Sequence, residues 1–332
     1  MNELIFFLNK VLISGAVIGS IYAMGAIGIT LIFSILRFAH FAHGDLMTTG
    51  AFITFALTAL FPQAGIAIGI PTAFLMLPIA MVITSLLAVG IDKAFYKPLR
   101  NHNVKPIVLV MASIGVTLML QGVLRLFFGT TSRNMFIDDR KEIFRLDLPW
   151  DLASKNIVIT EPQILLFLFL IVAVVSLHLF LTRSRLGKAM RAMSDNADLA
   201  RISGINVNLV VIVTWVIAGS LATAAGTLLA LDVSLKPDLS FSILLPIFAA
   251  AIVGGVGHPY GAILGGFVVG FSETLAVFNW SILLRPLAEV MAWDLPANMA
   301  LVPTEYKITV PFFILIAILV LKPTGILKGK VL

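Results

Sequence analysis

Long runs of apolar residues recur along the whole chain, and short polar connections separate them. Most of the runs come close to the roughly 20 residues that an α-helix needs to cross a bilayer. The runs are 11–35, 46–61, 66–89, 106–128, 163–181, 209–231, 243–256, 262–278 and 307–321. The pattern predicts an all-α integral membrane protein, a polytopic helical bundle of about eight to ten transmembrane segments that makes residues 1–332 a single transmembrane domain.

Two places in this pattern predict short or broken helices. The run 46–61 is short, and glycine and proline interrupt the chain at 257–261. Broken helices of this kind are typical of transporters, where unwound backbone lies beside a polar pathway. A weak internal repeat links the two places, with His43 matching His258, Gly50 matching Gly265 and Phe52 matching Phe267 at one constant spacing.

Composition supports the membrane assignment and excludes other classes. Of the 332 residues, 59% are apolar and 12% are charged, and the mean hydropathy is +1.04. Soluble domains are about a quarter charged, so soluble enzymes, nucleic-acid-binding domains and disordered chains do not fit. The expected surroundings are a lipid bilayer and not nucleic acid. Because the chain has no cysteine, disulfides, thiolate metal sites and cysteine nucleophiles are excluded.

The distribution of basic residues predicts an orientation. Lysine and arginine dominate the segments 92–105, 183–205 and 322–330, whereas the polar loop 129–161 carries both signs in similar number. Basic loops stay on the cytoplasmic side of a membrane. We therefore expect the three basic segments and the carboxyl terminus to be cytoplasmic, and the loop 129–161 and the amino terminus to be external.

The sequence offers little catalytic chemistry. No Gly-x-x-x-x-Gly-Lys-Ser/Thr motif is present, so any ATP would be bound and hydrolysed by another subunit, and no catalytic residue or cofactor is predicted. His40 and His43 lie three residues apart with Asp45 nearby. A metal site, structural hydrogen bonding at a helix break and the lining of a translocation pathway are all open for them. Because no further ligand lies close in sequence, no metal site is assigned.

Two carboxylates and one stripe of small residues have alternative readings. Asp45 and Glu273 are either proton carriers or carboxylates that sit at a polar helix end or pair with an arginine. Arg37 lies near a helix end, where a long basic side chain reaches the membrane interface. Gly15 and Gly19 begin a stripe of small residues, which packs against another helix of this chain or against a second membrane subunit.

The segment 183–208 predicts two short helices between two spans. Asp195 is a good N-cap for the second helix, and Gly204 suits the position just after its end. Leu199 and Ile202 would share one face. The result is a small amphipathic projection that either fits a groove on a soluble partner or is an ordinary basic cytoplasmic loop.

Four motifs make the chain resemble the permease subunits of branched-chain amino acid ABC transporters, of the LivH type. They are 19–24 (GSIYAM) with 28–33 (GITLIF), 41–45 (FAHGD) with 50–52 (GAF), 186–192 (LGKAMRA) with 196–205, and 253–257 (VGGVG) with 265–266 and the tail 323–327 (PTGIL). The chain departs from the family pattern at His40, where the family has Asn, and at Asp45, where it has Glu. The regions 129–161 and 281–305 are less similar to the family.

The resemblance implies a multi-subunit importer in the bacterial inner membrane. Its partners would be a second homologous permease chain, two cytoplasmic ATPase subunits and a periplasmic solute-binding protein, and 183–208 would be the ATPase-coupling loop. The candidate pathway residues are His40, His43, Gly44, Asp45, Gly50, Gly254, Gly255 and Gly257. The candidate coupling residues are Gly187, Lys188, Arg191, Ala192, Asp195, Asn196, Ala200 and Gly204.

Three alternatives stay open at this point. A permease of the same family could carry urea or short amides. A stand-alone ion-coupled transporter would use Asp45 or Glu273, and a membrane-embedded enzyme would use His40, His43 and Asp45.

Overall fold

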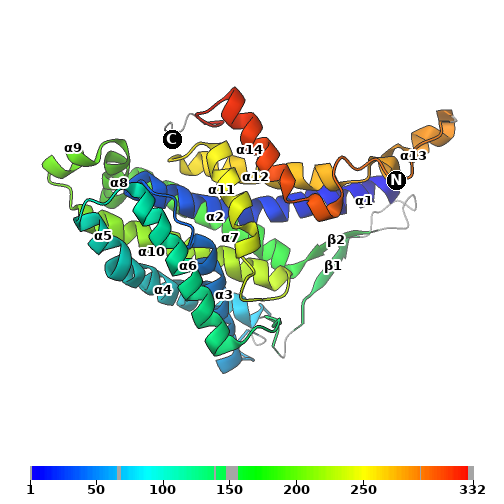
Figure 1. Cartoon of the computed structure of the whole chain (residues 1–332). Coiled ribbons are helices and arrows are strands. Elements are labelled where there is room, and N and C mark those ends of the chain that lie inside the picture. Colours follow the sequence, from blue (N-terminus) through cyan, green and yellow to red (C-terminus); the bar gives the residue numbers. More distant parts are fainter. Residues whose placement is uncertain (1, 66–68, 138–139, 147–155, 292, 328–332) are drawn as a thin grey trace.

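The computed structural model describes residues 2–65, 69–137, 140–146, 156–291 and 293–327, and these form a helical bundle with one small hairpin (Figure 1). The helices are α1 Asn2–Phe7, η1 Leu8–Ile13, α2 Ser14–Leu36, α3 His43–Leu60, α4 Thr72–Ile91, η3 Asp92–Tyr96, α5 Lys97–Asn101, α6 Pro106–Phe128, α7 Glu161–Arg183, α8 Arg185–Asp195, α9 Ala197–Ile202, α10 Val207–Asp232, α11 Phe241–Gly254, α12 Pro259–Val277, α13 Trp280–Met291, η4 Thr304–Tyr306 and α14 Thr309–Leu321. The antiparallel strands are β1 Ile143–Leu146 and β2 Ile157–Thr160.

The predicted helical membrane fold is confirmed. Within the described residues, six helical stretches are long and apolar enough to cross a membrane, and α11 and α14 are shorter apolar helices. Their burial differs strongly: 83% of the most apolar window of the stretch Asn2–Leu36 is buried, against 22% for α7. Apolar side chains that a bundle leaves uncovered need lipid around them, so α7 is a peripheral helix and α2 is a central one.

Glycines let the central helices approach each other closely. A Cβ added at Gly266 or Gly270 of α12 would lie 2.6 Å from a Cα atom of α2, that of Ala23 or Gly19. In the same way, Gly226 of α10 lies against the backbone of Met47 in α3. The stripe of small residues on α2 therefore packs within this chain, which is one of the two readings that the sequence allowed.

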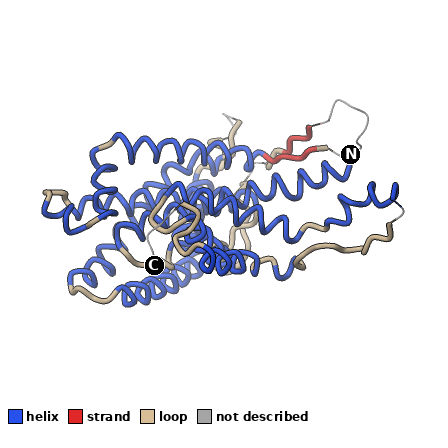
Figure 2. The backbone as a smooth tube through the Cα atoms, turned by 90° about the horizontal axis from the view of Figure 1, so that it is seen from above, coloured by secondary structure: helices blue, strands red, loops and turns tan. Residues whose placement is uncertain are grey.

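The bundle has two chemically different ends (Figures 1 and 2). At one end, which we call the hairpin end, lie the amino terminus, β1, β2 and α13. At the other, which we call the α8 end, lie α5, α8, α9 and the last described residues. The basic segments 92–105 and 183–205 share the α8 end and the described part of 129–161 lies opposite, as the charge pattern predicts. Residues 138–139 and 147–155 of that loop, and Lys328 and Lys330 of the tail, fall outside the described residues.

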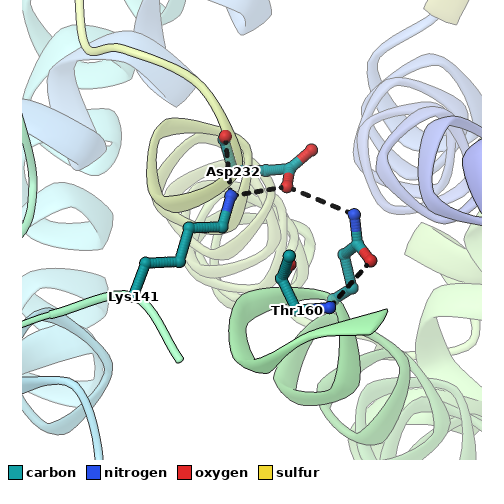
Figure 3. Close-up of polar contacts among 4 residues, drawn as sticks. Lys141, Thr160 and Asp232 are labelled. Atoms are coloured by element: carbon teal, nitrogen blue, oxygen red, sulfur yellow. Dashed lines mark hydrogen bonds and ion pairs between the residues drawn. The ribbon is translucent and has the colours of Figure 1, made fainter. Parts of the chain in front are cut away.

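Polar side chains tie the hairpin end together (Figure 3). Lys141 donates to the Asp232 carboxylate and to its carbonyl oxygen, both at 3.1 Å, at the carboxyl end of α10. The amide of Gln163 donates to the same carboxylate at 3.4 Å, and its oxygen accepts from the backbone N–H of Thr160 at 3.2 Å. A cation at a helix carboxyl end is favourable, so this cluster fixes the hairpin to α7 and α10.

The apolar run 66–89 begins before the helix that it contains, because α4 begins at Thr72. Pro71 takes an extended conformation with ψ of 130°, and Gly69 has a φ of +70°, so the chain turns there before the helix begins. Residues 66–68 themselves lie outside the described part of the chain.

Candidate functional site

His40 and His43 lie together inside the bundle, where the chain passes from α2 to α3. His40 precedes α3, and its Nε2 atom lies 3.1 Å from the hydroxyl oxygen of Tyr96. Its ring packs edge-on against Trp215, with centroids 4.9 Å apart. His43 begins α3 and fills the space beside Gly28, where a Cβ would collide with the imidazole. Both side chains are fully buried, so these histidines hold α2, α3 and α10 together.

Gly44 and Asp45 lie in the first turn of α3, directly after His43, and Gly50 lies about two turns along the helix. The Oδ1 atom of Asp45 accepts a hydrogen bond from the amide nitrogen of Gln121 at 3.0 Å, which joins α3 to α6. Gly44 faces the carbonyl oxygen of Ser240, and Gly50 faces the backbone of Thr223. These three residues therefore point to three different neighbours of α3.

The second group of candidate pathway residues forms a tight turn between α11 and α12. Gly255 and Gly257 have φ values of +110° and +92°, which favour glycine, and Gly254 packs against the backbone of Gly261. The tail closes on this turn: the N–H of Ile326 donates to the carbonyl of Val253 at 2.9 Å. The glycines thus join α11, α12 and the tail.

The geometry does not suggest a metal centre. Across the ranges described, no group of three His, Cys, Asp or Glu side chains gathers in a way that could hold a metal ion. The His40 and His43 ring centroids are 6.3 Å apart, and Asp45 is turned toward Gln121.

Glu273 has partners that the sequence reading missed. Its Oε2 atom accepts from the Tyr22 hydroxyl at 2.9 Å and lies 3.7 Å from the ammonium nitrogen of Lys307. The carboxylate is buried between α2 and α12, and its partners are a lysine and a tyrosine, not the arginine that one of the sequence alternatives named.

The predicted pair of short helices in 183–208 is present as α8 and α9. The Ser184 hydroxyl caps α8 by accepting from the N–H of Gly187 at 2.8 Å. The prediction that Asp195 caps α9 is wrong, because α8 continues through Asp195. Asn196 has the extended conformation of a cap and accepts from the N–H groups of Asp198 and Leu199, both at 3.0 Å. Gly204, with a φ of +82°, ends the pair as expected.

One face of this pair is packed on the bundle and another is free of it. Met190 and Met193 of α8 and Ala200 of α9 are buried. A Cβ at Gly187 would collide with the Phe180 carbonyl oxygen, so only glycine lets α8 lie this close to the end of α7. The remaining coupling candidates Lys188 and Arg191 are exposed and Ala192 is half-buried, while Leu199 and Ile202 are 57% and 80% exposed.

Arg37 connects α8 to the central helix α2, a role that the sequence reading missed. It follows α2 in a left-handed conformation, with φ of 58° and ψ of 32°, which is unusual for a residue with a side chain. Its guanidinium donates to the carbonyl of Ser194 in the last turn of α8 at 2.5 Å. The only sequence signal was an arginine directly after a helix, at a position that often carries glycine.

Comparison with known proteins identifies the family. The profile described as branched-chain amino acid transport system / permease component matches residues 11–319. The permease protein BraD of Pseudomonas aeruginosa is 30% identical over 334 residues, covering 98% of this chain and 97% of its own. LivH of Escherichia coli K12 is 30% identical over 335 residues with the same coverage. A probable LivH permease of Methanocaldococcus jannaschii is 30% identical over 272 residues, covering 81% of this chain and 82% of its own.

Both BraD and LivH are named as permease proteins of high-affinity branched-chain amino acid transport systems. The matched range, residues 11–319, includes the central helices, the α8–α9 pair and the glycine turn. The chain therefore belongs to the family of branched-chain amino acid transport permeases.

Proposed function

We propose that this chain is the membrane permease subunit of an ABC importer for branched-chain amino acids. The observation that carries the proposal is similarity to permeases of such systems over 98% of the chain, together with six helices able to cross a membrane. The chain supplies the path through the bilayer, and separate ATPase subunits supply the energy.

The α8–α9 pair is the contact with the ATPase subunits. Its exposed Leu199 and Ile202 are apolar side chains beyond the bundle, and the basic Lys188 on α8 is exposed as well. Apolar anchors with a charged rim are typical of a docking surface. The α8 end is then cytoplasmic, and the hairpin end faces the periplasm, where a solute-binding protein delivers the cargo.

Movement of α8 reaches the central helices through Arg37. The guanidinium holds the last turn of α8 to the end of α2, and α2 packs tightly against α12 through Gly19 and Gly270. A displacement of α8 by the ATPase therefore shifts α2 and α12 as rigid elements. With a second homologous permease beside it, such a shift opens the pathway alternately to either side of the inner membrane.

The candidate pathway residues of α3 and of the glycine turn form part of the route that the cargo takes. His43 and Gly50 lie where the central helices meet closely, Asp45 joins α3 to α6, and Gly257 lets the chain turn between α11 and α12. Helix rearrangement would expose the polar groups of α3 to the cargo. This role rests on the position of these groups in the central helices.

The proposal is tested by transport in reconstituted vesicles. The chain is assembled with its second permease and ATPase subunits, and uptake of radiolabelled leucine is measured with the solute-binding protein outside. We expect uptake only when ATP is present on the ATPase side, and no uptake by this chain alone. If this chain alone takes up leucine and an uncoupler abolishes the uptake, the chain is a stand-alone ion-coupled transporter instead. If the complex takes up urea or acetamide with ATP in preference to leucine, the proposed cargo is wrong.

The docking surface is tested separately with Ile202→Asp, which puts a charge into the proposed contact. We expect this variant to lose co-purification with the ATPase subunits. Val290→Asp is the control, because Val290 is 85% exposed on α13 at the hairpin end and should not affect ATPase binding. Full ATPase binding by Ile202→Asp would contradict the assigned surface.

A further inference from the structure

A cavity of about 330 Å³ lies beneath α8, away from the candidate pathway residues of α3 but with Gly257 of the glycine turn in its wall. Its walls come from the last turns of α2 and α7, from α8, and from the turn that begins α12. The cavity therefore lies between α8 on one side and α2, α7 and the beginning of α12 on the other. Its volume is within the range of sites for small molecules.

Apolar side chains make up one part of the wall. Leu31 and Ile35 come from α2, Leu181 from α7 and Met190 from α8. All four are nearly buried, so they are held in place by the surrounding bundle. A branched apolar side chain of a ligand would remove this surface from water, which favours binding.

Opposite charges make up another part of the wall. Arg191 and Asp195 both line the cavity and lie one helical turn apart on α8. Side chains at this spacing are close enough to pair. Within the part of the chain that the structure describes, they form no ion pair with each other or with another residue. Both charges are thus available to a ligand that carries an ammonium and a carboxylate.

The remaining wall is polar and rigid. The Nδ1 atom of His178 lies 2.8 Å from the hydroxyl oxygen of Tyr260, which ties α7 to the first turn of α12. His258 precedes that turn and also lines the cavity. An occupant in contact with α8 would therefore also touch the beginning of α12.

We propose that this cavity is a second binding site, which takes a free apolar α-amino acid from the α8 end. The apolar wall accepts its side chain, Asp195 its ammonium group and Arg191 its carboxylate. This inference rests on the proposed function for the orientation of the α8 end toward the cytosol. Because the bound amino acid bridges α8 and α12, it restrains α8, and accumulated cargo lowers the ATPase activity of its own importer.

The first test measures binding of radiolabelled leucine to the complex of permeases and ATPases in nanodiscs, without the solute-binding protein. We expect saturable binding and lower basal ATPase activity. Two competitors each lack one charge of leucine: 4-methylpentanoate and isoamylamine. A hydrogen bond to a charged group contributes about 1.5–3 kcal/mol, so each should compete about tenfold or more weakly than leucine.

The second test fills the cavity. Ser34 lines it, and its hydroxyl bonds only one turn back, to the carbonyl of Leu31 at 2.9 Å. Ser34→Leu should abolish leucine binding and the inhibition of ATPase activity. Ser242→Leu is the control for the change of side chain alone, because the Ser242 hydroxyl makes the same kind of bond, to the carbonyl of Leu239 at 3.0 Å, at an exposed position at the start of α11 and away from the cavity. Thr182→Leu fills the cavity from α7 and serves if Ser34→Leu does not assemble.

Several outcomes would overturn the site. One is the absence of saturable binding in a complex that imports leucine, which leaves the proposed function intact. Another is binding that His43→Ala abolishes and Ser34→Leu leaves unchanged, which would assign the bound leucine to the pathway. Displacement of leucine by anionic lipid, with no difference between the two competitors, would mark a lipid headgroup site. Failure of ATP-driven import with leucine binding intact would instead contradict the proposed function.

Discussion

The hairpin end of the bundle and the α8–α9 pair at the opposite end are held by different kinds of contact. At the hairpin end, Asp232 gathers Lys141 and Gln163, and Asn9 bonds both the carbonyl of Asn156 and the N–H of Val158. At the α8 end, the α8–α9 pair is held by buried methionines, by the close approach at Gly187 and by the guanidinium of Arg37.

This difference suggests that the two regions behave differently during transport. Several side-chain bonds from different elements make the hairpin end a fixed surface, whereas a few contacts position α8. Elements that move in a working cycle belong to the weakly held part of a structure, because their displacement must be energetically accessible. We therefore expect the α8–α9 pair to move during transport, and we expect single substitutions at its contacts to affect transport most.

The largest effect is expected from Gly187→Ala. A Cβ at this position collides with the Phe180 carbonyl oxygen and comes within 2.6 Å of the Leu181 Cα atom, so α8 must move away from α7. Overpacking of this kind costs about 1–3 kcal/mol, which displaces α8 in most molecules. We expect leucine uptake to fall about tenfold or more while ATP hydrolysis continues.

Gly115→Ala is the control for this change. Gly115 also lies in a helix, α6, but a Cβ there meets nothing within 4 Å. Its uptake should equal that of the unchanged protein. Normal uptake by Gly187→Ala, measured beside this control, would show that the position of α8 does not govern transport.

A smaller effect is expected from Arg37→Gly. Glycine removes the left-handed strain of roughly 1–2 kcal/mol but also removes the bond to Ser194, so the thermal stability should change little. Uptake per ATP hydrolysed should fall severalfold, because α8 loses its link to α2. Asn103→Gly relieves a similar φ of 52° without touching α8, and it should leave the ratio unchanged. An unchanged ratio in Arg37→Gly would remove Arg37 from the coupling route.

The sequence predicted those features that depend on local pattern. Apolar runs located the spans, the clustering of basic residues predicted which segments share an end, and the composition of 183–208 predicted two short helices with Gly204 at their end. Each of these signals lies within a few turns of one element, where hydrophobic burial and capping determine the outcome.

Features that depend on distant contacts were beyond the sequence. The sequence around Glu273 does not predict its contacts with Tyr22 and Lys307, and the sequence around Arg37 does not predict its contact with Ser194. These partners are distant along the chain, and only the fold brings them together. The prediction of the α9 cap was wrong for a different reason. Aspartate and asparagine are nearly equal as caps, so Asp195 and Asn196 could not be distinguished until the end of α8 was known.

The smallest effect is expected from Lys141→Ala at the hairpin end. The ion pair with Asp232 is 3.1 Å long, but both side chains are partly exposed, and such pairs contribute at most about 1 kcal/mol. We expect a small drop in the unfolding temperature, smaller still at high salt, and no change in uptake per ATP hydrolysed. Asp232→Asn should have a slightly larger effect, since it weakens the contact to Gln163 as well. The double variant should lose less than the sum of the two, because both changes remove the same pair. A loss of coupling in Lys141→Ala as large as in Arg37→Gly would mean that the hairpin end also moves during transport, and the contrast between the two ends would fail.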